Sequence, residues 1–346
     1  MDVPVSGRIR ARVGVSTALT AGIFAAALAA PAPAAAHGPA PAESPTVGAI
    51  VFGWTFEPLV VLVLAAAAFA WVRLVRRVNR SHPTNPVPRR RSVAFLSGLA
   101  VIAIALMSGI DAYDTTLFSV HMVQHILLTL VAAPLLAMGA PVTLLLRAAN
   151  PDVRRRLILP VLHSRVLRVV SFPVVAWLVF AGVMWGTHFS PLFDASLENP
   201  LIHDVEHALY LGAALLFWWP AVGLDPSPWR MPHPVRAMYV FLQMPQNTFL
   251  AVAILGSSVV LYPHYLTLAR TWGPAPLEDQ RIAGSLMWLL GDTVFIAALG
   301  AIIAGWMAFE RRREADVDRR VDRERQQIRE REARLAERLA AEREGQ

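Results

Sequence analysis

Long apolar runs, separated by short polar connections, dominate the hydropathy pattern of this chain after residue 55. A helix needs about 20 mostly apolar residues to cross the hydrocarbon core of a bilayer, and seven runs approach that length. They predict transmembrane helices at residues 56–77, 92–110, 116–138, 167–188, 200–222, 237–261 and 283–308. We therefore expect an all-α polytopic membrane protein whose membrane domain is a bundle of seven helices over residues 56–308.

A further apolar segment precedes these spans. Arg8, Arg10 and Arg12 come before the run VGVSTALTAGIFAAALAA, and the small residues of APAAAH follow it. A basic start, an apolar stretch and small residues at its end are typical of a secretory signal peptide. We predict a signal peptide over residues 1–36 and an extracytoplasmic leader over 37–55; an uncleaved first helix is the alternative.

The connections between the predicted spans alternate in charge. RLVRRVNRSHPTNPVPRRR after the first span is strongly basic, whereas DAYDTT after the second and FSPLFDASLENP after the fourth are acidic. Because basic loops stay in the cytoplasm, we expect the mature N-terminus outside and the C-terminus inside a bacterial plasma membrane. The charged stretch 309–346 is then a helical tail in the cytoplasm.

The composition agrees with a membrane protein. The chain is 55% hydrophobic and 16% charged, whereas a soluble protein carries about a quarter charged residues. Its net charge of +7 comes from arginines beside the apolar runs. That placement is typical of membrane topology, so we expect membrane lipid as a partner and no nucleic acid.

The lack of cysteine narrows the possible chemistry. It excludes disulfides, iron–sulfur clusters and thiolate metal sites, so any metal must bind His, Met, Asp, Glu or the backbone. The sequence has no phosphate-binding Gly-rich loop and no serine-hydrolase elbow. In HDVEH the acid directly precedes the second histidine, unlike the HExxH of zinc proteases. We therefore do not expect an enzyme.

Two histidine pairs begin two of the predicted spans. HMVQH carries His121 and His125, and HDVEH carries His203 and His207. The i, i+4 spacing puts each pair on one helix face, and both pairs fall at a similar depth on the outer side. Polar residues inside a membrane usually face the bundle interior, so four imidazoles could surround one metal ion. The alternative is that they are interfacial residues bonded to loop backbone.

Methionines and carboxylates share this outer half. Thioether and imidazole without thiolate suit copper, particularly copper(I), although methionine is also an ordinary core residue. The predicted ligands are His121, His125, His203, His207, Met122 and Met287. We expect Asp114 and Asp292 to accept hydrogen bonds from ligand histidines and so orient them. His188, His264 and Met184 also fall on this side.

Several segments together resemble a known family. HMVQHILLTLVAAPLLAMGAP, HDVEHALYLGAALLFWWPAVG, MPQNTFLAVAI and DQRIAGSLMWLLGD occur in this order. With the seven-helix layout, they resemble the CtaG family of cytochrome c oxidase assembly factors, of the caa-type oxidase group. The resemblance covers about residues 50 to 308. Residue by residue, it points to His121, His125, His203, His207, Asp279, Met287 and Asp292.

The resemblance implies a role in building an active haem–copper oxidase, with oxidase subunits as partners and copper delivery as the step. We therefore expect an assembly factor that holds copper in a His/Met site open to the outside and passes it on. One alternative is a haem-binding membrane redox protein, with histidines facing each other from two helices. Another is a copper or proton transporter, for which Gln243, Gln246 and Asn247 around Pro245 would line a route. The oligomeric state stays open.

Overall fold

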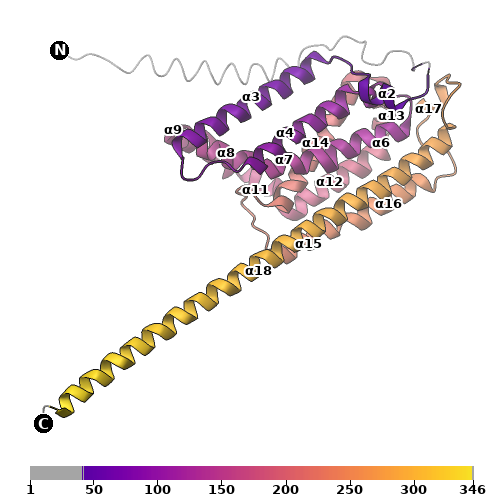
Figure 1. The fold of residues 1–346 in the computed structure, drawn as a ribbon. Coiled ribbons are helices and arrows are strands. Elements are labelled where there is room, and N and C mark those ends of the chain that lie inside the picture. Colours follow the sequence, from indigo (N-terminus) through magenta and orange to yellow (C-terminus); the bar gives the residue numbers. More distant parts are fainter. Residues whose placement is uncertain (1–40, 42, 345–346) are drawn as a thin grey trace, which may run out of the picture.

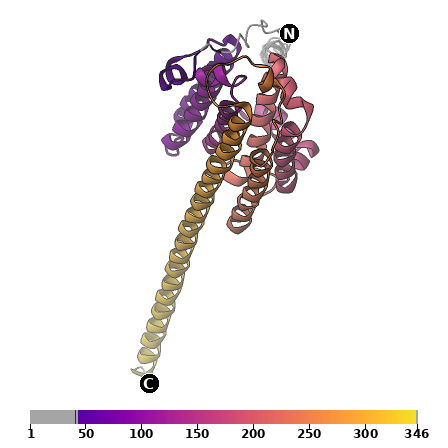
Figure 2. The same cartoon turned by 90° about the vertical axis from the view of Figure 1, so that its right-hand side faces the viewer.

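The computed structural model describes residue 41 and residues 43–344, with side chains up to residue 334. The predicted signal peptide, residues 1–36, lies outside the described residues. Within them every regular element is a helix, which confirms the predicted all-α class. The long helices lie side by side in one bundle, and the last of them, α18 (Pro276–Glu344), extends far beyond it (Figures 1 and 2).

Six helices among the described residues are long and apolar enough to cross a membrane, in agreement with a multi-pass membrane protein. Half of them are unbroken: α3 (Pro58–Ser81), α14 (Pro200–Val222) and α18. The others are built from consecutive pieces: α4 (Arg89–Met107) with α5 (Gly109–Tyr113), then α6 (Phe118–Ile126), the π-helix η1 (Leu127–Ala132), α7 (Ala133–Gly139) and α8 (Pro141–Ala148), and finally α15 (His233–Phe241) with α16 (Gln243–Leu255).

The fourth predicted span is shorter than expected. The sequence predicts one helix over 167–188, whereas α12 (Pro173–His188) has 16 residues. Phe172 is extended, with ψ 126°, because a residue before proline disfavours the helical conformation. After α12 the chain bends by 69° into α13 (Pro191–Glu198). The described residues therefore contain six spans, or seven if this bent pair counts as one.

The remaining short helices lie in the connections. They are α2 (Val47–Phe52), α9 (Pro151–Val153), the π-helix η2 (Arg154–Ile158), α10 (Leu159–Leu162), α11 (Arg165–Val170) and α17 (His264–Thr267). Among these, α2 falls in the predicted leader. In Figure 1, α2, α13 and α17 gather at one end of the bundle, and α8, α9 and α11 lie toward the other.

The largest apolar core lies between α6, α12, α14, α16 and α18. It contains Phe118, Phe180, Phe217, Leu250 and Phe295, each at most 2% exposed. A smaller core between α4, η1 and α7 holds Leu99, Ile102, Leu128 and Leu136. Burying these side chains against one another brings α6 and α14 together in the middle of the bundle, which positions the histidines described below.

A π-helix interrupts the third span directly after its histidines. Pro134 has no N–H, so a carbonyl about one turn earlier lacks its backbone donor. The indole Nε1 of Trp218, on α14, instead donates to the carbonyl of Thr129 at 2.9 Å. The hydroxyl of Thr129 donates to the carbonyl of His125 at 2.6 Å. These bonds tie the segment after His125 to α14.

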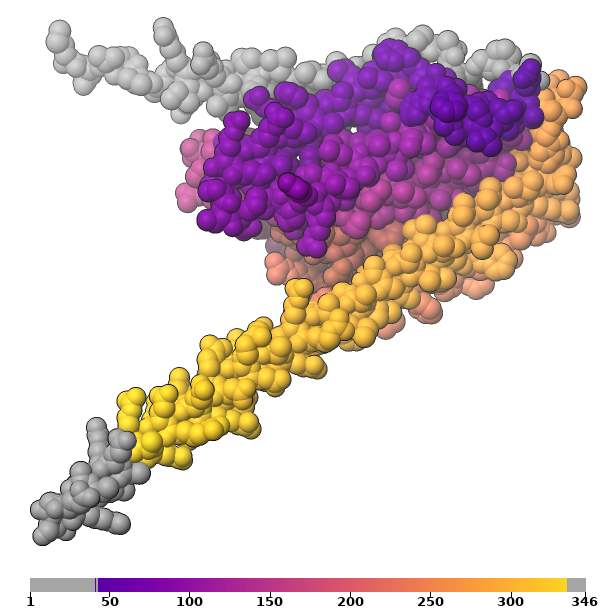
Figure 3. All heavy atoms as spheres, viewed as in Figure 1, coloured from indigo at the N-terminus to yellow at the C-terminus, as the bar shows by residue number. Residues whose placement is uncertain are grey.

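The helix α18 runs without a break through the predicted last span and the predicted charged tail. Beyond the bundle it stands clear as a single arm (Figure 3). Residues 316–334 are all exposed. Ion pairs one turn apart, such as Arg313 with Glu310 and Arg334 with Glu330, add only a few tenths of a kcal/mol each to such a helix, of order 0.2–0.5.

Candidate metal centre

Both histidine helices begin at defined caps near the same end of the bundle, where α5, α13 and α17 lie; we call it the histidine end. Asn199 caps α14, since its Oδ1 accepts from Leu201 N at 3.0 Å. The first turn of α6 is capped from another helix, because Asp279 on α18 accepts from Phe118 N at 2.7 Å. Asp279, to which the family resemblance points, thus holds the start of α6.

These caps give the two helices the same register. His121 and His125 are the fourth and eighth residues of α6, counted from Phe118. In α14 the same two places, counted from Pro200, are occupied by His203 and His207. The matched depth of the two pairs follows from matched helix starts.

The four imidazoles come together in the structure. Ring centroids lie 4.2 Å apart for His121 and His125 and 4.1 Å apart for His203 and His207. Between the helices, His121 lies 5.4 Å from His203, and His125 lies 5.7 Å from His207. Each of the four is at most 5% exposed. We call this set the four-histidine centre.

Two buried carboxylates lie beside this centre. Asp114 Oδ2 lies 3.4 Å from His203 Nε2, and Glu206 Oε2 lies 4.0 Å from His121 Nε2. Two sets of donor atoms fall within 4.8 Å of one another: Asp114 with His203 and His207, and Glu206 with His121 and His125. Each set joins oxygen with nitrogen in the way that copper and zinc sites do.

Asp114 sits in the short connection between α5 and α6 and is fully buried. Burial, and next the nearby carboxylate of Asp111, raise the pKa of Asp114 well above its usual range. The ionised form of such a group needs a cation beside it. A metal ion in the centre would supply that charge.

The sequence prediction missed Glu206. Its signal lies in HDVEH, where Glu206 is three residues after His203 and therefore on the same face of the helix, while Asp204 is not. The comparison of HDVEH with the zinc-protease motif does not test this i, i+3 spacing of His203 and Glu206. The predicted role of Asp114 as a hydrogen-bond acceptor that orients a ligand histidine stays a prediction: its carboxylate lies beside His203 Nε2 and is itself a candidate metal donor together with His203 and His207.

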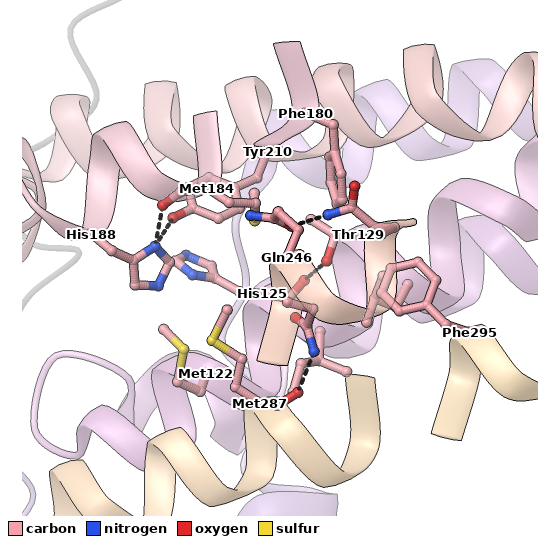
Figure 4. Close-up of a pocket in the computed structure, with 14 residues that line it drawn as sticks. Met122, His125, Thr129, Phe180, Met184, His188, Tyr210, Gln246, Met287 and Phe295 are labelled. Carbon is pink, nitrogen blue, oxygen red and sulfur yellow. Dashed lines mark hydrogen bonds between the residues drawn. The ribbon is translucent and has the colours of Figure 1, made fainter. Parts of the chain in front are cut away.

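Other predicted residues lie elsewhere. Met122 and Met287 line a small cavity with His125 (Figure 4), and neither Asp114 nor Glu206 lines it. The structure does not bring Asp292 to the centre: its oxygens accept from Asn247 Nδ2 at 3.2 Å and Thr248 Oγ1 at 2.8 Å. Asp292 therefore joins α18 to α16.

Aromatic residues cover the centre at the histidine end. Phe193 on α13, fully buried, lies 4.9 Å from the ring of His121 and 5.5 Å from that of His188. The Tyr265 hydroxyl donates to the carbonyl of Asp114 at 3.3 Å. We expected a site open to the outside, but its donors are covered in this structure.

Comparison with known proteins agrees with the resemblance seen in the sequence. Residues 69–308 match the family described as cytochrome c oxidase caa3 assembly factor (Caa3_CtaG). The chain is 31% identical over 290 residues, 81% of its length, to the uncharacterized proteins Mb0105 of Mycobacterium bovis and MT0111 of Mycobacterium tuberculosis. It is 30% identical over 277 residues, 78% of its length, to uncharacterized protein ML1998 of Mycobacterium leprae.

The chain spans 43% of the length of the first two relatives and 42% of the third. No solved structure matches it. The family match covers the helices that carry the four-histidine centre, α6 and α14, together with α12, α16 and the membrane part of α18. The chain therefore belongs to the family of cytochrome c oxidase caa3 assembly factors.

Proposed function

We propose that this protein binds copper in the four-histidine centre and delivers it to cytochrome c oxidase during assembly of the enzyme. The observation that carries the proposal is the convergence of four imidazoles and two carboxylates in one buried layer of a membrane bundle. Polar groups at such a position are costly and usually functional. A metal ion is the ligand that uses all of them.

Copper fits the proposal better than the other ions that these donors could bind. Imidazole suits copper and zinc, whereas magnesium and calcium prefer oxygen alone. The haem–copper oxidase that the family serves needs copper, and thioethers of Met122 and Met287 lie directly beyond His125. The ion is cargo, so the role is assembly, with no catalytic step.

The haem alternative is less compatible with the geometry. The cavity next to His125 has a volume of about 30 Å³, which is far too small for a porphyrin. Phe193 also lies against both histidines of α6, with ring centroids 4.9 Å from His121 and 6.3 Å from His125. A strong Soret band in the absorption spectrum of the purified protein would favour the haem alternative.

Metal analysis of the purified full-length protein tests the proposal. We expect copper in the wild type and loss of at least half of it in the double variant His203→Ala/His207→Ala, since both donors of one helix are removed. His163→Ala, an exposed histidine after α10, is the matched control and should keep the full copper content. The proposal is wrong if the wild type binds no copper, or if the double variant binds as much.

Delivery is tested in cells. A strain that lacks the protein, complemented with the double variant, should assemble oxidase of low activity, and added copper should restore part of it. Complementation by His163→Ala should match the wild type. Normal oxidase activity with the double variant at limiting copper would contradict the delivery step.

A further inference from the structure

A small cavity lies next to the four-histidine centre, between α6, α12, α14, α16 and α18. Its volume is about 30 Å³, enough for one ion or for one or two water molecules. Figure 4 shows the imidazoles of His125 and His188 side by side at one end of it, with the thioethers of Met122 and Met287 on one side of the rings. Met184 also lines it.

The tautomer of His188 is set by its surroundings. Its Nδ1 lies 2.7 Å from the carbonyl of Met184, one turn earlier on α12. A carbonyl only accepts, so Nδ1 carries the proton and Nε2 carries a lone pair. Nε2 has no hydrogen-bond partner among the described residues, and His188 is 3% exposed. A metal-binding histidine usually donates the N–H of one ring nitrogen to a protein oxygen and binds the metal through the other nitrogen.

His125 offers a second nitrogen to the same space. Its ring stacks on Tyr210, with centroids 4.1 Å apart and planes 24° apart. Neither ring nitrogen of His125 has a hydrogen-bond partner in the described part of the chain. The stacked ring is held in place without using its donors or acceptors. The ring of His125 lies between the four-histidine centre and His188: its centroid is 5.7 Å from that of His207 and 6.3 Å from that of His188.

The chemistry of this cavity differs from that of the four-histidine centre. No carboxylate lines it, whereas three methionines do: Met122, Met184 and Met287. Soft thioether ligands select copper(I), while carboxylates favour harder ions. The far wall is polar but uncharged, formed by the side-chain amides of Gln243, Gln246 and Asn247. An ion of single charge is the one least penalised in such a place.

We propose that this cavity is a second metal site, selective for copper(I), with Nε2 of His188, a ring nitrogen of His125 and the sulfurs of Met122 and Met287 as ligands. The proposal rests on the proposed function, since it takes copper as the ion. It adds a site with soft thioether ligands, and His125 belongs to both this site and the four-histidine centre. A copper(I) ion that moves between the two sites exchanges some of its ligands, and its oxidation state does not change.

Copper(I) loading of the full-length protein under anaerobic, reducing conditions tests the second site, with silver(I) as a redox-inert probe. We expect two copper(I) ions per chain in the wild type and a sulfur contribution to the X-ray absorption spectrum. His188→Ala should lower the affinity of the sulfur-bound ion at least about tenfold. The pair Met122→Leu/Met287→Leu should remove the sulfur contribution. Met107→Leu, a buried methionine outside the cavity, should change neither.

The results for different variants distinguish the second site from the four-histidine centre. In His203→Ala/His207→Ala the sulfur-bound ion should remain while the other is lost. If the wild type binds copper without any sulfur contribution, or if His188→Ala leaves both ions bound as tightly, the cavity holds only water and the second site is wrong, while the first stands. If the wild type binds neither copper(I) nor silver(I), the second site is wrong; if it also binds no copper(II), the proposed function fails as well.

Discussion

Asp279 lies about 160 residues after HMVQH in the chain, yet it caps the helix that carries this motif. Its two oxygens accept from the backbone N–H of Phe118 and from the hydroxyl of Ser119, in the first turn of α6. The turn that contains His121 is therefore held by a single buried carboxylate on α18. The position of His121, a member of the four-histidine centre, therefore depends on a residue that is not part of that centre.

Substituting Asp279 should destabilise the protein and loosen the centre. We expect Asp279→Ala to lower the free energy of unfolding by about 1–2 kcal/mol, in the range of a lost helix cap, and Asp279→Asn to lower it less, because one acceptor oxygen remains. Thermal unfolding in detergent compares the stabilities of the wild type, Asp279→Asn and Asp279→Ala. The exposed neighbour Glu278→Ala is the control, and an equal effect at both positions would contradict the capping role.

Single residues also show where sequence reasoning reached its limit. The i, i+4 spacing correctly predicts that the two histidines of each pair share a helix face, because a helix fixes which residues share a face. The sequence places His188 on the outer side, but nothing in it shows that the Met184 carbonyl fixes the tautomer of this histidine. Asp292 was expected near a histidine, but depth alone does not define the helix face that contacts α16.

The third span is the element whose local structure departs most from an ordinary helix. The sequence predicts one helix over 116–138, and the structure divides it into α6, η1 and α7. Pro134 lacks the N–H that would bond to a carbonyl in this stretch, and Trp218 on α14 donates to the carbonyl of Thr129 instead. Such π-helical turns are frequent at functional sites, and this one begins two residues after His125.

We expect Trp218→Phe to cost about 1–3 kcal/mol of stability, because it leaves a buried carbonyl without its donor. Trp219→Phe is the matched control: the indole Nε1 of Trp219 has no hydrogen-bond partner among the described residues, so that substitution lacks this cost. Thermal unfolding of the two variants in the same detergent compares them. A larger loss of stability in Trp219→Phe would refute the role assigned to Trp218.

The whole molecule consists of a closed bundle and a long exposed arm. All members of both proposed sites lie within the bundle, and residues 316–334 are exposed. The arm therefore contributes no ligand and little packing. Its many charges keep it solvated, which fits a helix that stands clear of the bundle (Figures 1 and 3).

A chain that ends at Arg313 should keep the melting temperature and the copper content of the full-length protein, since the contact of Phe309 with His233 is retained. Metal analysis and thermal unfolding check this in one preparation. Loss of bound copper on truncation would show that the arm supports the sites, contrary to our expectation.

The sequence by itself determined the all-α class, most of the membrane helices and the two histidine pairs, because hydropathy and helical periodicity are properties of neighbouring residues. Only the tertiary structure decided which donors meet. It brought Asp114 and Glu206 to the histidines, closed the centre under Phe193, and separated the methionines with His188 into a cavity of their own. These contacts join residues far apart in the chain, and the packing of helices against one another is what selects them.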